Sequence, residues 1–313
     1  IKSKRIIELT SNEAGIVFRK DKTFLLDWMQ VYMEAQESAG KKDGSQIKIA
    51  MRILKDYAGE MVTLDQIDGD FCRGYITYLL TEYHPKGKDI SNYTLHNYYR
   101  ALNGALNSAV RKKKMKANPF NELEKSEKIR KPESMRSYMT IEEVQALIDT
   151  PMPHEEYEIV KCAYLFSCFC GLRISDIIKL KWNDVFVDRG QYRLAVSMKK
   201  TKEPIYLPLS PEALKWMPER GGKSSEDNVF DLPSANTIRM QLKPWAKAAG
   251  ISKRFSYHTS RHTFATMMLT LGADLYTVSK LLGHADVKMT QVYAKIINKK
   301  KDEAVNLVNG LFH

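Results

Sequence analysis

A polar and charged stretch, residues 119–137, most limits what this chain can fold into, because it separates two segments with apolar residues at helical spacing. The stretch contains Pro132 and lacks apolar periodicity, which is typical of a linker. A chain of 313 residues is also long for a single hydrophobic core. We therefore predict a short N-terminal extension over residues 1–20, a first domain over residues 21–118 and a second domain over residues 138–313.

The first segment has the pattern of a small bundle of four helices. Apolar residues recur at helical spacing over about residues 23–38, 47–57 and 68–82. A fourth helix begins after Ser91, a favourable N-cap residue, and ends in the basic run of residues 111–114.

The second segment predicts a larger and mostly helical domain with a small antiparallel sheet. Thr140 and Glu143 form a capping-box pattern at its first helix, and Gly171 suits the left-handed residue after a helix end. Residues 184–209 alternate as strands do, with residues 199–202 at the turn of a hairpin. The predicted fold class is mainly α (α+β).

The charge of the chain favours a polyanionic partner. Lys and Arg number 49 against 37 Asp and Glu, a formal net charge of +12. Residues 86–116 hold eight basic side chains and one acidic side chain, whereas residues 21–70 hold six and ten. The basic end of the fourth helix has two interpretations: it complements the helix dipole, or it contacts phosphates. The candidate DNA-binding residues are Lys86, Lys88, Asn92, Thr94, Arg100, Arg111, Lys112, Lys113, Lys114, Lys199 and Lys202.

Other features exclude several classes of protein. No apolar run is long enough to span a membrane and no signal peptide is visible, so a cytoplasmic protein is the default expectation. The first residue is Ile1 rather than Met, which is compatible with a start inside a longer protein. The four cysteines form no C-x-x-C pair, which disfavours a zinc ribbon and favours buried apolar roles for residues 162, 168 and 170.

Six residues in one order have the chemistry that cutting a phosphodiester requires: Arg173, Lys200, His258, Arg261, His284 and Tyr293. An anionic phosphodiester needs positive charge at its non-bridging oxygens, a nucleophile and a proton for the departing oxygen. Two guanidinium groups suit the first need, because arginine is always charged and binds phosphate in a bidentate way.

The other four residues suit the remaining steps. Tyr293 is the candidate nucleophile, activated by nearby positive charge and by a base such as His258. His258 suits a general base and then a general acid, and His284 suits a hydrogen bond to a phosphate oxygen or assistance in proton transfer. Lys200 is the candidate donor of the proton to the leaving 5′ oxygen, with Lys199 and Lys202 as close competitors.

A metal site is the alternative interpretation of one histidine pair. His258 and His262 lie four residues apart on an expected helix, but Thr259 stands where a zinc protease motif has Glu. We therefore expect His262 to be a packing or supporting residue, and no metal. No Gly-rich P-loop is present, so ATP is not implied and no cofactor is expected.

The order and spacing of these phrases resemble the tyrosine recombinase (phage integrase) family. Cys-Gly-Leu-Arg ends at Arg173, His-Thr-Ser-Arg spans 258–261, and Leu-Leu-Gly-His is followed by Tyr nine residues later. The Lys-Thr pair at 200–201 matches the family's lysine in a turn between strands. The resemblance implies a SAM-like core-binding domain that grips DNA, and a catalytic domain.

The resemblance also implies the reaction and the partners. Family members cut one DNA strand through a 3′-phosphotyrosyl bond, without metal or ATP, and four protomers exchange strands at two core-type sites of double-stranded DNA. We therefore expect a mobile-element integrase, monomeric without DNA, with accessory DNA-bending or excision factors. Residues 1–20 are too short for an arm-binding domain but fit the end of its last helix. The apolar tail after Tyr293 packs either on its own domain or on a neighbouring protomer.

Two rival functions remain open from the sequence. One is a non-catalytic DNA-binding protein of the same fold, which would not need Tyr293. The other is a type IB topoisomerase, which shares the chemistry but relaxes supercoils; the small helical N-terminal domain favours recombination.

Overall fold

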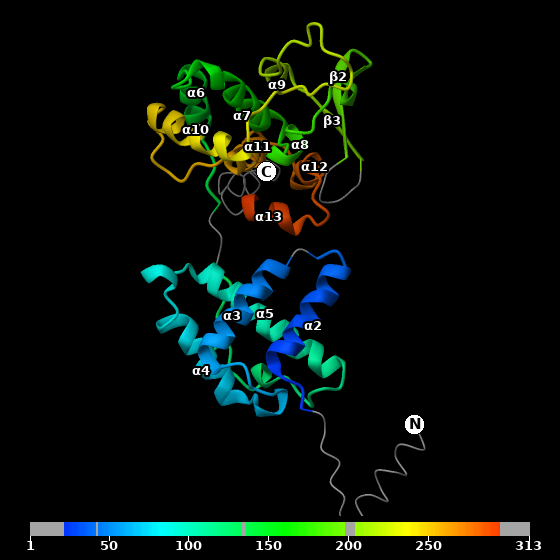
Figure 1. Ribbon diagram of the computed structural model, residues 1–313. Helices are drawn as coiled ribbons and strands as arrows, with labels where there is room; N and C mark the ends of the chain where they lie inside the picture. The colour runs from blue at the N-terminus through cyan, green and yellow to red at the C-terminus, as the bar shows by residue number, and fades with distance from the viewer. Residues whose placement is uncertain (1–21, 42, 133–135, 198–203, 295–313) are drawn as a thin grey trace, which may run out of the picture. The chain divides into compact units, whose positions relative to one another are not determined.

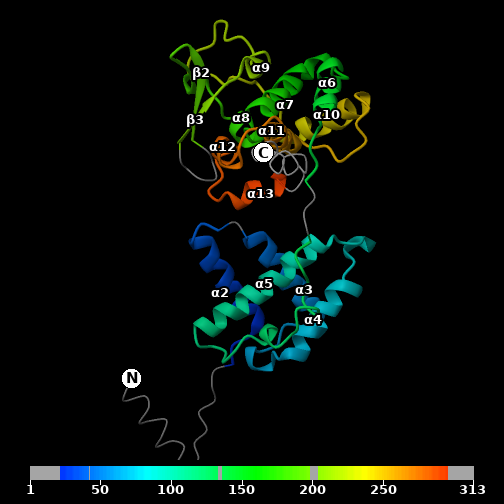
Figure 2. The ribbon, with the colours of Figure 1, turned by 180° about the vertical axis from the view of Figure 1, so that it is seen from behind.

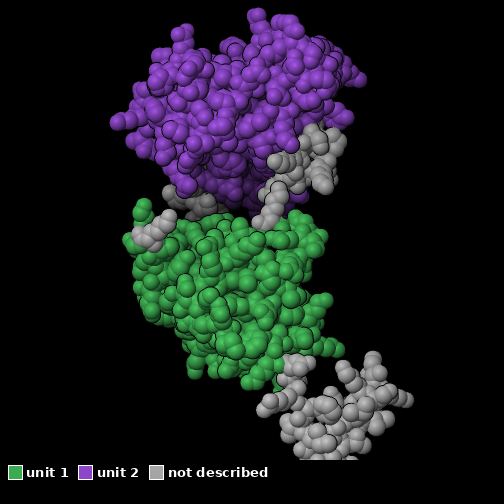
Figure 3. Space-filling view, in the orientation of Figure 1, with its two compact units in different colours: residues 1–134 green, residues 135–313 purple. Residues whose placement is uncertain are grey.

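The computed structural model describes residues 22–41, 43–132, 136–197 and 204–294. The chain divides into two compact units, residues 1–134 and residues 135–313 (Figure 3). Each unit has a hydrophobic core of its own. Each is therefore built around its own set of helices and is described by itself below.

In its described residues, unit 1 contains four α-helices (Figure 1). Three of them, α2, α3 and α5, pack on one another, and α4 packs on α3 and α5. The elements are α2 (Leu25–Ser38), α3 (Gly44–Ala58), η1 (Leu64–Gln66), α4 (Gly69–Thr81), η2 (Pro85–Gly87), α5 (Asn92–Arg111) and η3 (Pro119–Asn121).

Local sequence signals set the starts of two of these helices. The Ser91 hydroxyl accepts a hydrogen bond from the backbone N–H of Thr94, which confirms the predicted N-cap of α5. The Asp68 carboxylate caps α4 in the same way, by accepting from the N–H of Phe71. Leu95, Leu102 and Leu106 then bury one face of α5 in the core.

Part of the predicted linker belongs to unit 1. Phe120, Leu123 and Ile129 are buried in the core of this unit, and the ring of Phe120 meets that of Tyr99 edge to face at 5.0 Å. The Asn118 carboxamide oxygen accepts from the N–H of Phe120 and so fixes the turn. These apolar residues follow no helical or strand period because each reaches the core from an irregular loop, and the sequence pattern missed them for that reason.

In its described residues, unit 2 is helical with one small sheet. Its elements are α6 (Ile141–Asp149), η4 (Glu155–Tyr157), α7 (Glu158–Cys170), α8 (Ile174–Ile177), η5 (Trp182–Asp184), β1 (Val185–Asp188), β2 (Gln191–Ser197), β3 (Pro204–Pro208), α9 (Pro211–Leu214), α10 (Ala235–Ala248), α11 (Tyr257–Thr270), α12 (Leu275–Leu281) and α13 (Lys288–Ala294). The Thr140 hydroxyl accepts a hydrogen bond from the backbone N–H of Glu143, and the Glu143 carboxylate accepts one from the backbone N–H of Thr140. This capping box confirms the predicted start of α6.

The sheet has the order β1-β2-β3 and both pairings are antiparallel. Leu194 in the central strand lies opposite Val185 and Leu207, and Leu194 and Leu207 are buried in the unit core. With the helices around it, this sheet confirms the predicted mainly α (α+β) fold class. The predicted hairpin turn at 199–202 lies outside the described residues.

Helix α7 is the central element of unit 2 and packs against α8, α9, α10 and α11. Figures 1 and 2 show α7 and α11 side by side from opposite directions. The Tyr257 hydroxyl, at the start of α11, donates to the carbonyl oxygen of Ala163 at 2.7 Å and lies 3.0 Å from the Ser167 hydroxyl. Buried polar contacts therefore fix where α11 begins, and with it the residues of its first turns.

Candidate active site

Helix α11 carries three of the site residues in its first two turns. Ser256 and Thr259 form a capping box at its start. His258 is exposed, whereas Arg261 and His262 are buried. The helix therefore presents one histidine to solvent and carries one cation and one further histidine into the interior of unit 2.

Arg261 is 2% exposed and is held by two backbone carbonyl groups. Its two terminal nitrogens donate to the oxygen of Gly171, at 2.7 Å, and to that of Leu282, at 2.5 Å. A guanidinium has five N–H donors, so donors remain for an anionic ligand. Burial, and then the charge of Arg173, lowers the pKa of Arg261 to about 10, so the group stays protonated at neutral pH.

Gly171 is needed where α7 ends. Its φ of 74° is left-handed, which confirms the prediction for this position. A Cβ at this position would lie 2.5 Å from Cδ1 of Phe264 on α11. The glycine thus lets the chain turn and lets α11 approach closely enough for Arg261 to reach the Gly171 carbonyl.

Arg173 follows as the N-cap residue of α8, with its side chain 17% exposed. One terminal nitrogen lies 4.0 Å from a carboxylate oxygen of Asp176, which is itself buried. The charge of Arg173 is one of the causes that lower the pKa of Arg261, so the two guanidinium groups are close enough to repel each other. Two guanidinium groups this close have the positive charge that an anionic ligand requires.

Tyr293, on α13, reaches this neighbourhood from the C-terminal end of the described chain. Its side chain is 1% exposed and packs with Phe264 and Leu282. Its hydroxyl lies 2.6 Å from Nδ1 of His262 and accepts a hydrogen bond from Arg136 at 3.1 Å. The Arg136 guanidinium carbon also lies 5.6 Å from the centre of the phenol ring.

His262 is held in its neutral form. Its pKa is lowered to about 3, first by burial and then by the positive charges of His258, Arg136, Arg261 and His284. The rings of His258 and His262 meet edge to face with centroids 4.6 Å apart. Arg136, Arg261 and the three histidines therefore act on one another within one site.

His284 is oriented by two hydrogen bonds. Its Nδ1 lies 2.7 Å from the buried hydroxyl of Thr290, and its backbone N–H donates to the carbonyl oxygen of Ser279. His284 as a whole residue is 9% exposed, and it lies just after the end of α12. The Thr290 contact therefore fixes the direction in which the other ring nitrogen, Nε2, points.

Five of the six predicted site residues are thus described and lie in unit 2, while Lys200 lies outside the described residues, as do Lys199 and Lys202. Arg136 and Thr290 are additional residues that the sequence pattern did not single out, and His262 touches the phenol rather than only packing. The position of His262 directly after Arg261 is a sequence feature that could have identified it as a site residue. Nothing local marked Arg136, which lies 157 positions before Tyr293.

The predicted DNA-binding residues of unit 1 are gathered around α5. Asn92, Arg100 and Arg111 are exposed on the helix, Thr94 is half-buried, and Lys88, Lys112, Lys113 and Lys114 are exposed beside it. For Lys86 only the backbone is described.

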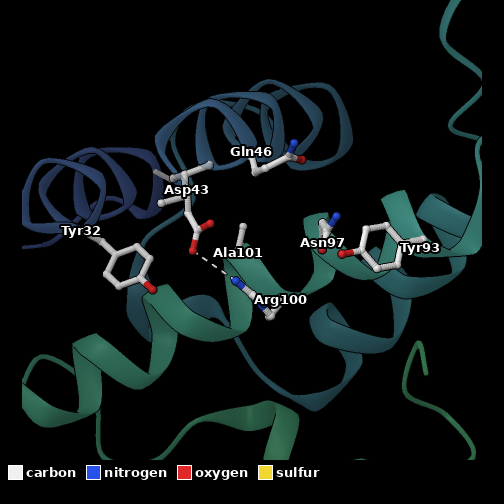
Figure 4. Close-up of a pocket in the computed structure, with 8 residues that line it drawn as sticks. Tyr32, Asp43, Gln46, Tyr93, Asn97, Arg100 and Ala101 are labelled. Atoms are coloured by element: carbon white, nitrogen blue, oxygen red, sulfur yellow. Dashed lines mark hydrogen bonds and ion pairs between the residues drawn. The ribbon is translucent and has the colours of Figure 1, made fainter. Parts of the chain in front are cut away.

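A polar pocket of about 200 Å³ opens among α2, α3 and α5 in unit 1 (Figure 4). In it Arg100 forms an ion pair with Asp43, with a nitrogen-to-oxygen distance of 3.2 Å. The amides of Gln46 and Asn97 and the ring of Tyr93 line the same pocket. The pocket thus holds amide groups beside the paired Arg100 guanidinium and Asp43 carboxylate.

Within the described residues, no helix is long and apolar enough to cross a membrane. Across the same residues, no group of three or more His, Cys, Asp or Glu side chains is placed to hold a metal ion.

Two family models match this chain. Residues 137–300 match the phage integrase family, and residues 24–130 match the phage integrase SAM-like domain. A tyrosine recombinase of Pseudothermotoga lettingae is 29% identical over 242 residues, which cover 70% of this chain and 82% of that protein. The tyrosine recombinase XerD of Vibrio vulnificus is 32% identical over 184 residues, 54% of this chain and 59% of that protein.

Solved structures share the fold. The Tn1549 transposon integrase in complex with transposon right end DNA superposes with a TM-score of 0.70 at 16% identity, covering 92% of this chain and 99% of that chain. A lambda integrase tetramer bound to a Holliday junction superposes with a TM-score of 0.66 at 20% identity, covering 88% and 78%.

Proposed function

The chain belongs to the phage integrase family, and from this premise we propose that it is a site-specific recombinase that cuts and rejoins DNA through a 3′-phosphotyrosyl bond. The observation that carries the proposal is the meeting of the Tyr293 phenol with positive groups from distant segments. Arg136 donates a hydrogen bond to the phenol oxygen. Arg261 donates to the carbonyl oxygens of Gly171 and Leu282, at the ends of α7 and α12, and interacts electrostatically with Tyr293.

In the proposed reaction, Arg173 and Arg261 bind the non-bridging oxygens of the scissile phosphate. Their fixed positive charge offsets the charge that develops on these oxygens in the transition state. The Tyr293 oxygen attacks phosphorus, and the bond from phosphorus to the 5′ oxygen breaks. Arg261 suits this role because its two carbonyl partners hold it in place before DNA arrives.

The remaining residues handle protons and orientation. We assign Lys200 to give a proton to the departing 5′ oxygen, with Lys199 and Lys202 as the competing lysines. His258 is exposed beside the buried cluster and suits proton transfer at the phosphate. His284, fixed by Thr290, suits a hydrogen bond to a phosphate oxygen.

Unit 1 is proposed to grip the core site through α5 and the basic residues that follow it. Arg100, Arg111 and Lys112–Lys114 bring positive charge to one helix and its end. Phosphate contacts of this kind supply affinity without sequence information, whereas the amides near Arg100 suit base contacts. Assembly as a tetramer on two sites is part of the proposal, by analogy with the lambda integrase tetramer on a Holliday junction.

The finer biological task that we propose is integration or excision of a mobile element. The likeness to the transposon integrase covers nearly the whole chain. Resolution of duplicated sites is the second candidate task, favoured by the higher sequence identity to relatives named XerD. Recombination between sites on two separate molecules supports integration, whereas recombination only between two sites on one circle fits excision or resolution.

The test of the proposed chemistry is a covalent adduct. The chain is incubated with nicked duplexes that it has itself selected from a random-sequence pool, and the products are run on a denaturing gel. We expect a protein–DNA adduct with the wild type and none with Tyr293→Phe, while both bind the duplex equally in a mobility-shift assay. An adduct that persists in Tyr293→Phe, or no adduct with the wild type, contradicts the proposal.

A further inference from the structure

The hydrogen bonds described at the Tyr293 oxygen indicate that the two histidines of α11 have different roles. Nδ1 of His262 lies 2.6 Å from the phenol oxygen and the Arg136 guanidinium lies 3.1 Å from it. His258, one turn earlier, is exposed. We infer that His262 is the base that takes the proton of Tyr293, and that Arg136 stabilises the phenolate that results. This inference rests on the proposed function.

The donor and acceptor roles follow from the partners. Arginine has donors only, so the Arg136 contact uses a lone pair of the phenol oxygen. We assign the phenol O–H as the donor and the unprotonated Nδ1 of a neutral imidazole as the acceptor of the 2.6 Å contact. His262 is neutral at pH 7 because its pKa is lowered to about 3 by burial and by surrounding charge. The neutral ring therefore carries its proton on Nε2.

The proton balance of cleavage is complete with these groups. As the Tyr293 oxygen bonds to phosphorus, its proton moves to Nδ1 of His262 and the 5′ oxygen departs with a proton from Lys200. In rejoining, a 5′ hydroxyl attacks the phosphotyrosine and returns its proton to the neutral Lys200, while the departing phenol oxygen recovers the proton from His262. The net proton count is unchanged after one cycle, and no further reactant is needed.

The groups around His262 keep its imidazole neutral in the free protein. His258 and Arg261 on α11, His284 after α12 and Arg136 before α6 all face this imidazole and make it a weak base. An anionic phosphodiester bound by Arg173 and Arg261 offsets that positive charge and strengthens the base. The phenol proton is therefore released when the substrate is in place, which protects the nucleophile until then.

The first test needs no DNA site. Side-chain 15N NMR of the wild-type chain reports which imidazole nitrogen carries a proton. We expect His262 to be neutral, with the proton on Nε2, from pH 5 to pH 8, and its Nδ1 signal to shift in Tyr293→Phe. A proton on Nδ1, or an Nδ1 signal that Tyr293→Phe leaves in place, overturns the assignment.

The second test is the rate of adduct formation at saturating DNA, with the nicked duplexes described above. His262→Asn keeps a polar group near Nδ1 but cannot take the proton, and we expect it to slow cleavage about 10²- to 10³-fold at pH 7 with unchanged DNA binding. Its rate should then rise up to about tenfold per pH unit, because the phenol must ionise without a base. The wild-type rate should vary less over the same range.

Controls separate this inference from the proposed function. His154→Asn changes an exposed histidine outside the site and should keep the wild-type rate and pH profile. Arg136→Lys should retain more activity than Arg136→Gln, because a cation near the phenol oxygen remains. If the wild type forms its adduct and His262→Asn matches it in rate and pH profile, only the assignment of the base fails. If the wild type forms no adduct, the proposed function fails and this inference fails with it.

Discussion

The polar residues of the two units are arranged in opposite ways. In unit 2, Arg261 and His262 are buried, and carbonyl oxygens and the Tyr293 hydroxyl hold them in position. In unit 1, Arg100 is exposed and meets one exposed carboxylate, that of Asp43. A buried cation has few alternative positions, whereas an exposed one is solvated and moves at little cost. The contrast suits chemistry at one fixed phosphate in unit 2 and adjustable contacts along a duplex in unit 1.

The largest effect that this comparison predicts is that of Arg261→Ala. The substitution removes a proposed phosphate ligand and takes away the Arg261 donor from the carbonyl oxygens of Gly171 and Leu282. We expect adduct formation to fall by about 10³-fold or more. The free energy of unfolding should also fall by about 2 kcal/mol. Adduct assays and denaturant unfolding monitored by circular dichroism measure the two effects.

Arg261→Lys is the matched control, because it keeps the charge but lacks a fork that spans both carbonyl groups. It should restore part of the stability and little of the rate. An Arg261→Ala variant that is as stable and as active as the wild type would remove the distinction between the two units.

A second effect concerns the close approach of α7 and α11. Gly171→Ala introduces a side chain at a φ of 74°, with its Cβ 2.5 Å from a carbon of Phe264. We expect the free energy of unfolding to fall by about 3 kcal/mol, because the left-handed backbone is strained for alanine and its Cβ clashes with Phe264. Gly190→Ala shares a positive φ of 80° but meets no atom within 4 Å, so it should cost only about 1 kcal/mol. Equal losses in urea unfolding would mean that the close packing contributes nothing.

A third effect is the pH dependence of stability caused by His262. Its pKa is lowered from 6.5 to about 3 on folding, so the unfolded chain binds its proton first as pH falls. The associated stability is complete above pH 6.5 and is lost as pH decreases toward 3. Between pH 7 and pH 5 the wild type should lose about 1 to 2 kcal/mol through this residue. The loss should be absent in His262→Asn, as measured by urea unfolding at both pH values; parallel curves for the two proteins would contradict it.

The site could be predicted from sequence where its residues lie in short phrases. Gly171 and Arg173 adjoin a helix end, and His258 and Arg261 share the first turns of one helix. Such local patterns also predicted the caps at Ser91 and Thr140, because a cap depends on residues three positions apart. The fold class followed from the same periodicities.

The other site and core residues could not be predicted, because their positions depend on contacts between segments that are distant in the sequence. Arg136 reaches Tyr293 across 157 positions, and no pattern near residue 136 signals that contact. The burial of Phe120 and Leu123 in the core was also not predictable, because apolar residues in a loop do not recur at helical or strand spacing. Burial also decided which histidine meets the phenol: both are on α11, and only the packing around His262 distinguishes it from the exposed His258.

The smallest expected effect is that of Arg100→Ala in unit 1. Removing one exposed cation should weaken DNA binding several-fold and reduce the slope of log affinity against log salt by about 1, while cleavage of the bound complex is unchanged. Arg73→Ala is the matched control, since Arg73 also forms exposed ion pairs, with Asp70 and Glu127, outside the basic segment. Mobility-shift titrations at two salt concentrations measure both variants. If Arg73→Ala changes the salt slope as much as Arg100→Ala does, net charge rather than the α5 face governs binding. If Arg100→Ala also slows cleavage of bound DNA by an amount close to that of His262→Asn, the exposed face of unit 1 takes part in the chemistry, and the separation of the two units into an adjustable grip and a fixed site is wrong.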